Sequence, residues 1–242
     1  MHRSIKALAL VGLGLFLYSR FFSGNLLYYI NVRFVWLTLL AAVGLIAVGA
    51  SYRYVSGHTH THDHTGHDHG QLTWFGLLLV MLPVILGLLV PPQPLGAAAM
   101  GSRDISTEAL TSTTAPGRNE ILAKPKGDKN VYDWLVEFSM VNDPAAFTGK
   151  EARLIGFIYR DDRFKGDEFM VSRFVISCCA ADAAPLGLLV KWPESGALAQ
   201  DQWVEVKGQF DLGRFDGEEL PVLMAESISP IETPAQPYLY PY

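Results

Sequence analysis

The sequence is poor in charged residues, which make up 18% of its 242 positions, and its mean hydropathy of +0.20 is high for a soluble protein. A single soluble domain is therefore not expected. The first hundred residues hold two acidic and five basic side chains, whereas the rest of the chain holds 22 and 14. Because the net charge is −5 and no run of lysine and arginine occurs, the composition argues against a nucleic-acid partner.

Cysteine is also scarce, and histidine is absent after position 69. The two cysteines, Cys178 and Cys179, are neighbours, and a disulfide between adjacent residues requires a distorted peptide, so no cross-link is assumed. No histidine lies beyond His69 to complete a Ser/His/Asp or Cys/His arrangement in the C-terminal half. The sequence therefore predicts a protein that is not an enzyme and has no catalytic residues.

Three apolar segments, at about 5–22, 34–52 and 72–90, are the main feature of the first hundred residues. Each approaches the roughly 20 helical residues that cross a bilayer, so residues 1–95 are predicted to form a membrane domain of three transmembrane helices. The first segment could instead be a cleaved signal peptide. Bulky residues stand where a small-residue cleavage site would follow, and this favours a retained span.

Three spans would place the N-terminus and the C-terminal domain on opposite sides of the membrane. The lysine and arginine residues that flank the spans are evenly divided between the two sides and do not decide the orientation. The stretch 102–114, which follows the third span, is rich in serine and threonine and contains no lysine. Because cytoplasmic loops are enriched in lysine and arginine, this composition favours an N-terminus inside the cell. The prediction is a multi-pass protein of the cell (inner or plasma) membrane with an extracytoplasmic soluble domain.

A histidine-rich loop lies between the second and third segments. Imidazole is a common ligand for zinc and other divalent transition metals, and carboxylates can complete or orient such a site. No single tetrahedral set stands out, so the loop is predicted to collect several ions rather than to close one structural site. A solvated linker, a pH-sensing loop and an expression-tag remnant are the alternatives. The predicted ligands are His58, His60, His62, His64, His67, His69, Asp63 and Asp68.

The remainder is predicted to comprise a linker at 96–129 and a soluble domain at 130–242. Asn130 can cap a helix over 131–140, and alternating patterns predict strands at 151–159, 168–177, 186–192, 202–210 and 220–228. Five strands and one helix fit a small barrel of the OB type. The predicted fold class is thus a membrane α domain with three transmembrane helices, followed by a mainly-β, OB-like small barrel with one flanking helix.

The pair Cys178 and Cys179 follows the second of these strands, and Asp182 lies three residues further on. Two thiolates and a carboxylate could accept a soft or borderline metal ion. In the alternative, which is the favoured interpretation, the cysteines are two small hydrophobic residues that close the barrel and Asp182 caps a turn.

The chain contains the motifs Phe22-Ser-Gly-Asn25, Tyr29-Ile-Asn31, Ser172-Arg-Phe174, Cys179-Ala-Ala-Asp182, Gly187-Leu-Leu-Val190, Pro193 and Pro237-Tyr-Leu-Tyr240. Together they resemble the motifs of the YcgQ family of bacterial membrane proteins, whose members are described as proposed permease subunits. The similarity covers nearly the whole chain and implies a companion subunit to a separate multi-spanning permease, with a link to zinc or other metal homeostasis. Relatives can carry cysteines inside the histidine loop; their absence here favours Zn²⁺ or Ni²⁺ over Cu⁺.

Residues and resemblance together predict a non-enzymatic accessory subunit of a membrane permease in divalent metal (zinc) homeostasis. Its expected partners are the multi-spanning permease and the lipid bilayer, without nucleic acid, and its barrel would dock on the permease. No cofactor is required, although Zn²⁺ or another divalent transition metal is compatible with the loop. The alternative is a membrane-anchored module that binds a ligand or protein and has no transport role.

Overall fold

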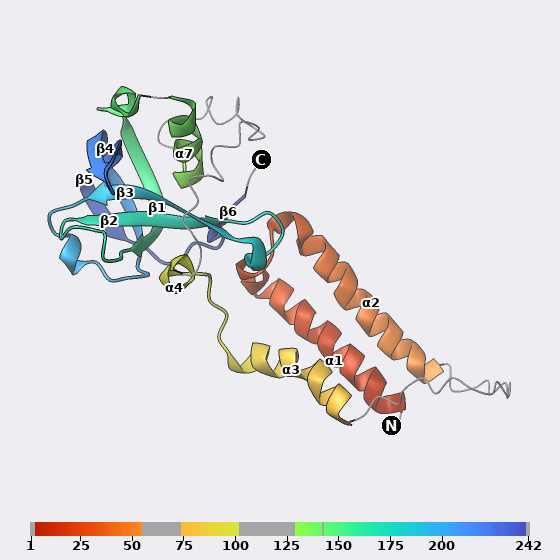
Figure 1. Ribbon diagram of the computed structural model, residues 1–242. Coiled ribbons are helices and arrows are strands. Elements are labelled where there is room, and N and C mark those ends of the chain that lie inside the picture. Colours follow the sequence, from red (N-terminus) through yellow and green to blue (C-terminus); the bar gives the residue numbers. More distant parts are fainter. Residues whose placement is uncertain (1–2, 55–73, 102–128, 142, 241–242) are drawn as a thin grey trace. The chain divides into compact units, whose positions relative to one another are not determined.

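The computed structural model describes residues 3–54, 74–101, 129–141 and 143–240. It divides the chain into two compact units, Met1–Gln93 and Pro94–Tyr242. The first unit is helical and the second is built around a β-sheet (Figure 1). The predicted histidine loop, residues 58–69, lies outside the described residues.

The N-terminal unit contains three apolar helices. Two of them are long and apolar enough to cross a membrane, as predicted. The third has 16 residues, a length of about 24 Å at 1.5 Å per residue, against a hydrocarbon core of about 30 Å. The helices are α1 (Arg3–Phe22), α2 (Val35–Tyr54) and α3 (Trp74–Leu89), and the 3₁₀ turns η1 (Asn25–Tyr28) and η2 (Val32–Phe34) connect the first two.

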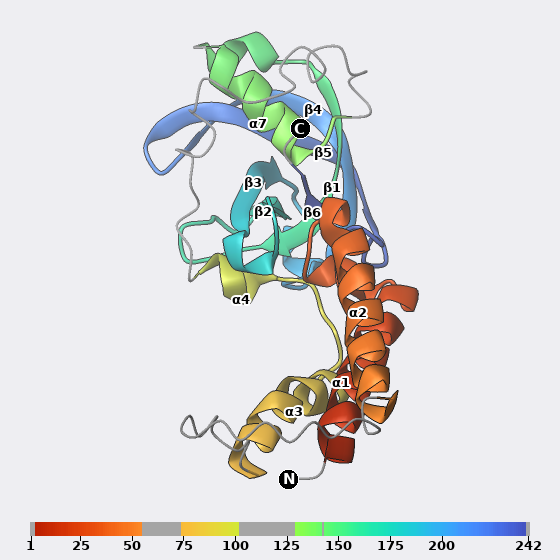
Figure 2. The ribbon, with the colours of Figure 1, turned by 90° about the vertical axis from the view of Figure 1, so that its right-hand side faces the viewer.

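Small residues line the contact between α1 and α2, which run side by side in Figures 1 and 2. A Cβ added at Gly14 would lie 2.7 Å from Ile46 Cγ1 and 2.9 Å from the Ala42 carbonyl oxygen. A Cβ added at Gly49 would lie 2.7 Å from Val11 Cγ2. Because glycine at these points lets the two backbones approach closely, the pair packs as small-residue membrane helices do.

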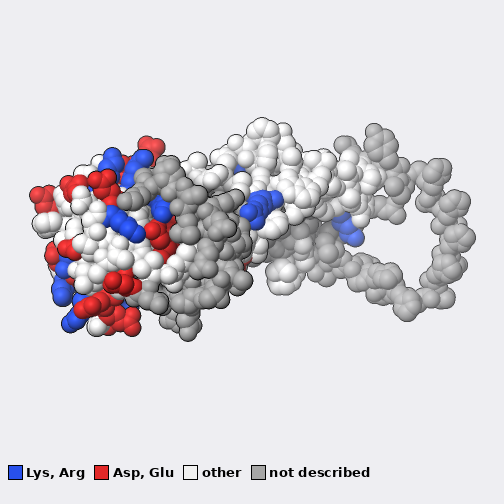
Figure 3. All heavy atoms as spheres, turned by 90° about the horizontal axis from the view of Figure 1, so that it is seen from above, with Lys and Arg blue, Asp and Glu red and all other residues white. Residues whose placement is uncertain are grey.

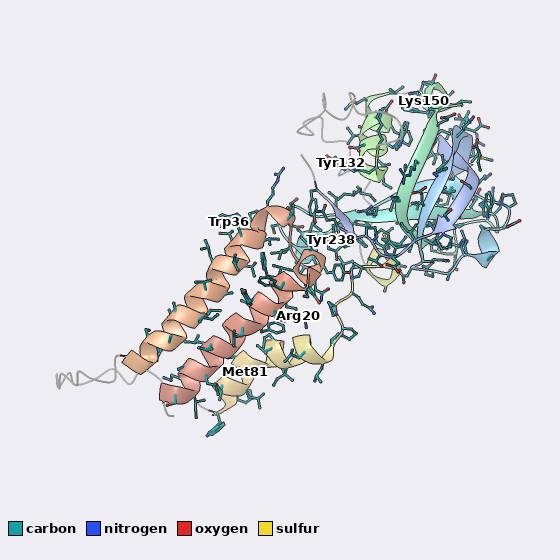
Figure 4. The ribbon with its side chains drawn as sticks, turned by 180° about the vertical axis from the view of Figure 1, so that it is seen from behind. Arg20, Trp36, Met81, Tyr132, Lys150 and Tyr238 are labelled. Atoms are coloured by element: carbon teal, nitrogen blue, oxygen red, sulfur yellow. The ribbon has the colours of Figure 1, made fainter. Side chains whose placement is uncertain are left out.

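Helix α3 contacts α1 near its own C-terminal end. Pro91 has no N–H, so the carbonyl of Gly87 has no helical donor four residues later. Arg20 of α1, labelled in Figure 4, donates a hydrogen bond to that carbonyl, and its guanidinium lies 5.1 Å from the centre of the Phe16 ring. A polar side chain thus satisfies a backbone group that an apolar environment would leave unpaired.

Helix α7 (Val131–Met140) of the C-terminal unit has the predicted bounds and the predicted cap. The Asn130 side chain accepts a hydrogen bond from the Asp133 N–H at 3.1 Å, and the Asp133 carboxylate accepts the Asn130 N–H at 3.0 Å. This reciprocal arrangement satisfies two of the amides that the start of a helix leaves free. Val131 and Trp134 are fully buried and anchor the helix on the sheet.

Six strands form one mixed sheet, ordered β1-β4-β5-β3-β2-β6. An additional β1–β2 pairing closes the first five into a ring, in which β3 and β5 are parallel and the other neighbours are antiparallel. The turn between β4 and β5 contains Asp216 and Gly217, both at positive φ, as a two-residue hairpin turn requires. The strands are β1 (Glu151–Tyr159), β2 (Glu168–Val175), β3 (Ala184–Lys191), β4 (Trp203–Phe215), β5 (Glu218–Pro230) and β6 (Tyr238–Leu239).

Alternate residues of the strands enter two separate hydrophobic clusters. In β1, Leu154 and Ile158 join the cluster that α7 covers, whereas Phe157 joins the second cluster. The second cluster also contains Ala97 and Met100 of the short helix α4 (Ala97–Met100), which falls within the predicted linker. The chain just after Gln93 therefore takes part in the packing of the sheet.

Candidate functional site

The two cysteines lie in the connection between β2 and β3. Strand β2 is tied at its end to the C-terminal segment, because the Ile176 N–H donates to the Leu239 carbonyl at 3.0 Å. The chain then makes the 3₁₀ turn η6 (Ala180–Asp182), whose N-cap is Cys179. A paired strand thus fixes one side of the turn and β3 fixes the other.

Cys178, Cys179 and Asp182 bring their side-chain donor atoms together, with all of these atoms within 4.8 Å of one another. The two Sγ atoms are 3.6 Å apart. The Asp182 carboxylate accepts the backbone N–H groups of Ser177, Cys178 and Cys179 at 3.0, 2.7 and 3.4 Å. The turn itself therefore holds the carboxylate beside both thiols.

The electrostatics of the cluster keep negative charge on Asp182. Burial acts to raise the pKa of this carboxyl, but hydrogen bonds from the Cys178 thiol and from the three backbone amides outweigh it and lower the pKa. The hydrogen bond to Asp182, followed by that to Cys179, raises the pKa of the Cys178 thiol to about 11. Without a cation beside it, Cys178 is a protonated thiol at neutral pH and a poor nucleophile.

The cluster gathers the three residues that the sequence predicted as a possible second site. The alternative of two buried hydrophobic residues is wrong for Cys178, which is exposed, while Cys179 is half-buried. The other part of that alternative is confirmed, because Asp182 does cap the turn. The eight predicted ligands in the histidine loop lie outside the described residues, and metal binding by either set stays a prediction.

Sequence reasoning missed the role of Arg173, which is 7% exposed in the middle of β2. Its guanidinium donates to the carbonyls of Pro237, Ile155 and Gln236 at 2.8, 3.3 and 2.9 Å, and it lies 5.2 Å from the centre of the Trp203 ring. Burial lowers the pKa of Arg173 to about 10. The signal that could have found it is a charged residue well inside the strand, among the apolar side chains of Val171, Phe174 and Val175.

Arg173 and the cysteine pair act on the same short segment of the fold. The guanidinium binds Gln236 and Pro237 just before β6, and β6 pairs in parallel with the end of β2, directly before the cysteines. In the part of the chain that the structure describes, no carboxylate pairs with this guanidinium. We therefore assign Arg173 a structural role, which is to fix the strand end from which the cysteine turn begins.

The surface of the C-terminal unit carries most of the acidic side chains. Figure 3 shows aspartate and glutamate gathered on this unit, whereas the helices of the other unit are almost entirely uncharged. Several of these carboxylates are paired, as Glu205 is with Arg153 at 2.5 Å and with Lys207 at 3.0 Å. Among the described residues, this surface therefore carries charge of both signs, much of it in ion pairs.

Comparison with known proteins identifies both parts of the chain. The DUF1980 N-terminal domain matches residues 5–106, and the DUF1980 C-terminal domain matches residues 121–241. UPF0703 protein YcgQ of Bacillus subtilis (strain 168) is 26% identical over 280 aligned positions, which cover 97% of this chain and 98% of that protein. A Streptococcus mutans serotype c protein named "Putative two-component membrane permease complex subunit" is 24% identical, with 90% and 92% of the two chains covered.

Proposed function

This chain belongs to the YcgQ-like family with DUF1980 N-terminal and C-terminal domains, and from that membership we propose that it is a non-enzymatic accessory subunit of a membrane permease. The observation that carries the proposal is the full-length similarity to a relative whose name places it in a two-component membrane permease complex. Two apolar helices long enough to cross a bilayer support a membrane location. The process we propose is divalent metal homeostasis, with zinc as the leading ion.

The membrane part is proposed to be multi-pass. Helices α1 and α2 would form a hairpin of two spans, and α3, which lies within the predicted segment 72–90, would form a third. Many of the large apolar side chains of α3 are exposed, among them Phe75 at 75% and Leu88 at 71%, and this is favourable only in lipid or against another apolar surface. With three spans and an internal N-terminus, the C-terminal unit would lie on the extracytoplasmic side.

These helices are unsuited to carrying an ion on their own. Their sequences contain no aspartate, glutamate or histidine, the side chains that line ion pathways within membranes. The path for the transported ion would therefore belong to a separate multi-spanning subunit. This chemistry favours an accessory role for the chain over a role as the transporter itself.

The C-terminal unit is proposed to be an OB-like barrel that docks on the permease. The closed ring of five strands with α7 packed over its core supports this architecture. Such barrels bind many kinds of ligand, so the fold alone does not choose one. The partner is proposed from the two-component name of the relative.

The histidine loop is proposed to collect divalent metal close to the permease. Six imidazoles and the carboxylates of Asp63 and Asp68 occur within twelve residues, a density of borderline ligands that suits Zn²⁺. A metal titration of the full chain in detergent tests this role. Replacing the six histidines with alanine is expected to remove most of the bound zinc, whereas replacing Thr59, Thr61 and Thr65 in the same loop is expected to leave it. Equal zinc in both variants would contradict the proposal.

Copurification separates the proposed subunit from a membrane-anchored binding module with no transport role. A tagged full chain is expected to retain one multi-spanning membrane protein in about equal amount, identified by mass spectrometry. Residues 94–242 alone are expected to retain less of that protein, because they lack the helices that would pack beside it. A full chain that retains no multi-spanning protein, while residues 94–242 retain a secreted protein in the absence of metal, would favour the binding module instead.

A further inference from the structure

We infer that Cys178, Cys179 and Asp182 form a separate metal site in the C-terminal unit, which takes a thiophilic divalent cation such as Zn²⁺ or Cd²⁺ and leaves one coordination position open. This site uses no residue of the histidine loop, so it goes beyond the proposed collecting role of that loop. Its ligands come from one turn of five residues between two strands of the ring.

The separation of the two sulfur atoms fits a tetrahedral ion. With zinc–sulfur bonds of about 2.3 Å, two thiolates on a tetrahedral ion lie about 3.8 Å apart, whereas two on opposite sides of an ion would lie about 4.6 Å apart. The Sγ atoms of Cys178 and Cys179 are 3.6 Å apart. An ion can therefore bind both sulfurs with little change in the turn, and the spacing favours tetrahedral over linear coordination.

The carboxylate of Asp182 is positioned before any ion arrives. A carboxylate offers about four lone-pair positions, and three backbone N–H groups from residues 177 to 179 occupy three of them. The Cys178 thiol donates to the remaining position, and a metal would take that position when it replaces the thiol proton. Both thiols lie within 4.8 Å of the carboxylate oxygen that would bind the metal. The backbone bonds fix the orientation of this ligand, as outer contacts do in established metal sites.

A redox pair is a weaker explanation of the same residues. Consecutive Cα atoms are about 3.8 Å apart across a trans peptide, whereas disulfides usually join Cα atoms about 4.4–6.8 Å apart. The structure contains no cis peptide bond in its described residues, and both cysteines are free thiols. The two sulfurs are better placed to share an ion than to bond to each other.

Exposure decides what kind of metal site this is. Cys178 and Asp182 are exposed, so an ion can enter directly from solvent. Two sulfurs and one oxygen leave a tetrahedral ion with a fourth position for water or for a ligand from another molecule. Structural zinc sites instead surround the ion with four protein ligands. The arrangement suits an ion that is received and passed on.

Cadmium binding to the full chain tests the inference, because thiolate-to-cadmium charge transfer gives an ultraviolet band that imidazole does not. The chain with all six loop histidines changed to alanine is expected to bind one Cd²⁺ with this band. Adding Cys178→Ser and Cys179→Ser is expected to abolish both the band and the ion. The two cysteines carry little of the core, so circular dichroism should show an unchanged fold.

Asp182→Asn provides the finer test, with Asp143→Asn as its matched control. Asp143 also accepts a backbone N–H at the start of a 3₁₀ helix, from Ala145 at 3.0 Å, but the metal-ligand cluster does not include it. We expect Asp182→Asn to weaken Cd²⁺ binding by about tenfold or more and Asp143→Asn to leave it unchanged. An absence of the thiolate band from the six-histidine variant, Cd²⁺ binding that survives both cysteine substitutions, or equal affinities for the two asparagine variants would overturn the inference.

Alkylation of the cysteines in the unaltered chain tests the same site. Zn²⁺ is expected to slow alkylation of both cysteines by iodoacetamide, and a chelator is expected to restore the rate. Alkylation that is indifferent to Zn²⁺, together with loss of both free thiols under mild oxidation, would replace the metal site with a redox pair.

Discussion

The guanidinium of Arg173 is buried and pairs with no carboxylate among the described residues. Its contribution to stability therefore depends on hydrogen bonds to backbone carbonyls. Lysine has a single nitrogen and cannot reach three carbonyls in three directions or stack on the Trp203 ring. We expect Arg173→Lys to lower the free energy of unfolding by about 2 kcal/mol, since two buried carbonyls lose a charged donor. Urea unfolding of residues 94–242 measures this. The exposed Arg214→Lys is the control, and an equal loss in both variants would contradict the assignment.

Glu137 gives a pH dependence whose direction is fixed by its two lysine partners. Burial acts to raise the pKa of this carboxyl, but hydrogen bonds and charge from Lys129 and Lys150 outweigh it and lower the pKa. A carboxyl with a lowered pKa in the folded state stabilises the fold above its ordinary pKa of about 4.3, and that stability is lost as the pH falls through the lower folded value.

Glu137→Gln is therefore expected to cost about 1 kcal/mol at pH 7, and the difference should shrink below about pH 4. Thermal unfolding of both proteins between pH 3 and pH 7 measures it. Glu226→Gln, which removes an exposed carboxyl on β5, is the control for the loss of one acidic side chain. A Glu137→Gln deficit that stays constant down to pH 3 would exclude the ion pairs as its cause.

At the scale of elements, two glycines of the helix pair α1–α2 lie where the helices touch, and two others do not. A Cβ at Gly14 or Gly49 would meet atoms of the facing helix at 2.7 Å, whereas a Cβ at Gly12 or Gly44 would meet nothing within 4 Å. We expect Gly14→Ala and Gly49→Ala each to destabilise the helix pair by about 1–2 kcal/mol, because the helices must separate. Unfolding of the full chain in mild detergent measures this. Gly12→Ala and Gly44→Ala should have no cost, and equal effects at all four positions would refute the close contact.

Elements with a local signal could be predicted from the sequence, and those that depend on distant partners could not. The cap at Asn130 and the period of the apolar residues placed α7 at its observed bounds, and alternation found five strands with ends shifted by a few residues. Strand β6 has two residues, too few for a period, and exists because β2 is beside it. The extension of β4 and β5 to Phe215 and Glu218 comes from their mutual pairing.

The candidate site likewise combines features that the sequence shows with features that depend on the fold. The adjacency of Cys178 and Cys179 and the spacing to Asp182 are visible in the sequence. Their exposure and the 3.6 Å between the sulfurs are not visible there, because both depend on how the turn is held between β2 and β3. Apolar length identified the two long helices, but composition alone does not show that Pro91 leaves the Gly87 carbonyl for Arg20.

At the scale of the whole molecule, each unit has its own source of stability. The N-terminal unit exposes apolar side chains along all three helices, which is favourable in a bilayer. The C-terminal unit buries two clusters and pairs many of its surface charges, which is favourable in water. The packing contacts of the C-terminal unit therefore indicate at which residue this unit begins.

The packing places that beginning at Pro94, well before α7. Ala97 and Met100 are buried in the second cluster, and the Ala97 N–H donates to Asp201. The Leu95 N–H donates at 2.9 Å to the hydroxyl of Tyr238, which is labelled in Figure 4. Removing these contacts exposes the apolar surface that they cover, at a cost of about 3 kcal/mol. For a unit of this size, that corresponds to a thermal midpoint lower by about 6–12 °C.

We therefore expect a fragment of residues 94–242 to unfold by circular dichroism at a clearly higher temperature than a fragment of residues 129–242. Met100→Ala in the longer fragment should reproduce much of the loss, because it removes the most deeply buried side chain of α4. Met224→Ala, at a methionine that is 42% exposed, is the matched control and should have little effect. Equal midpoints for the two fragments would mean that residues 94–101 do not stabilise the fold, and the C-terminal unit would then begin at α7.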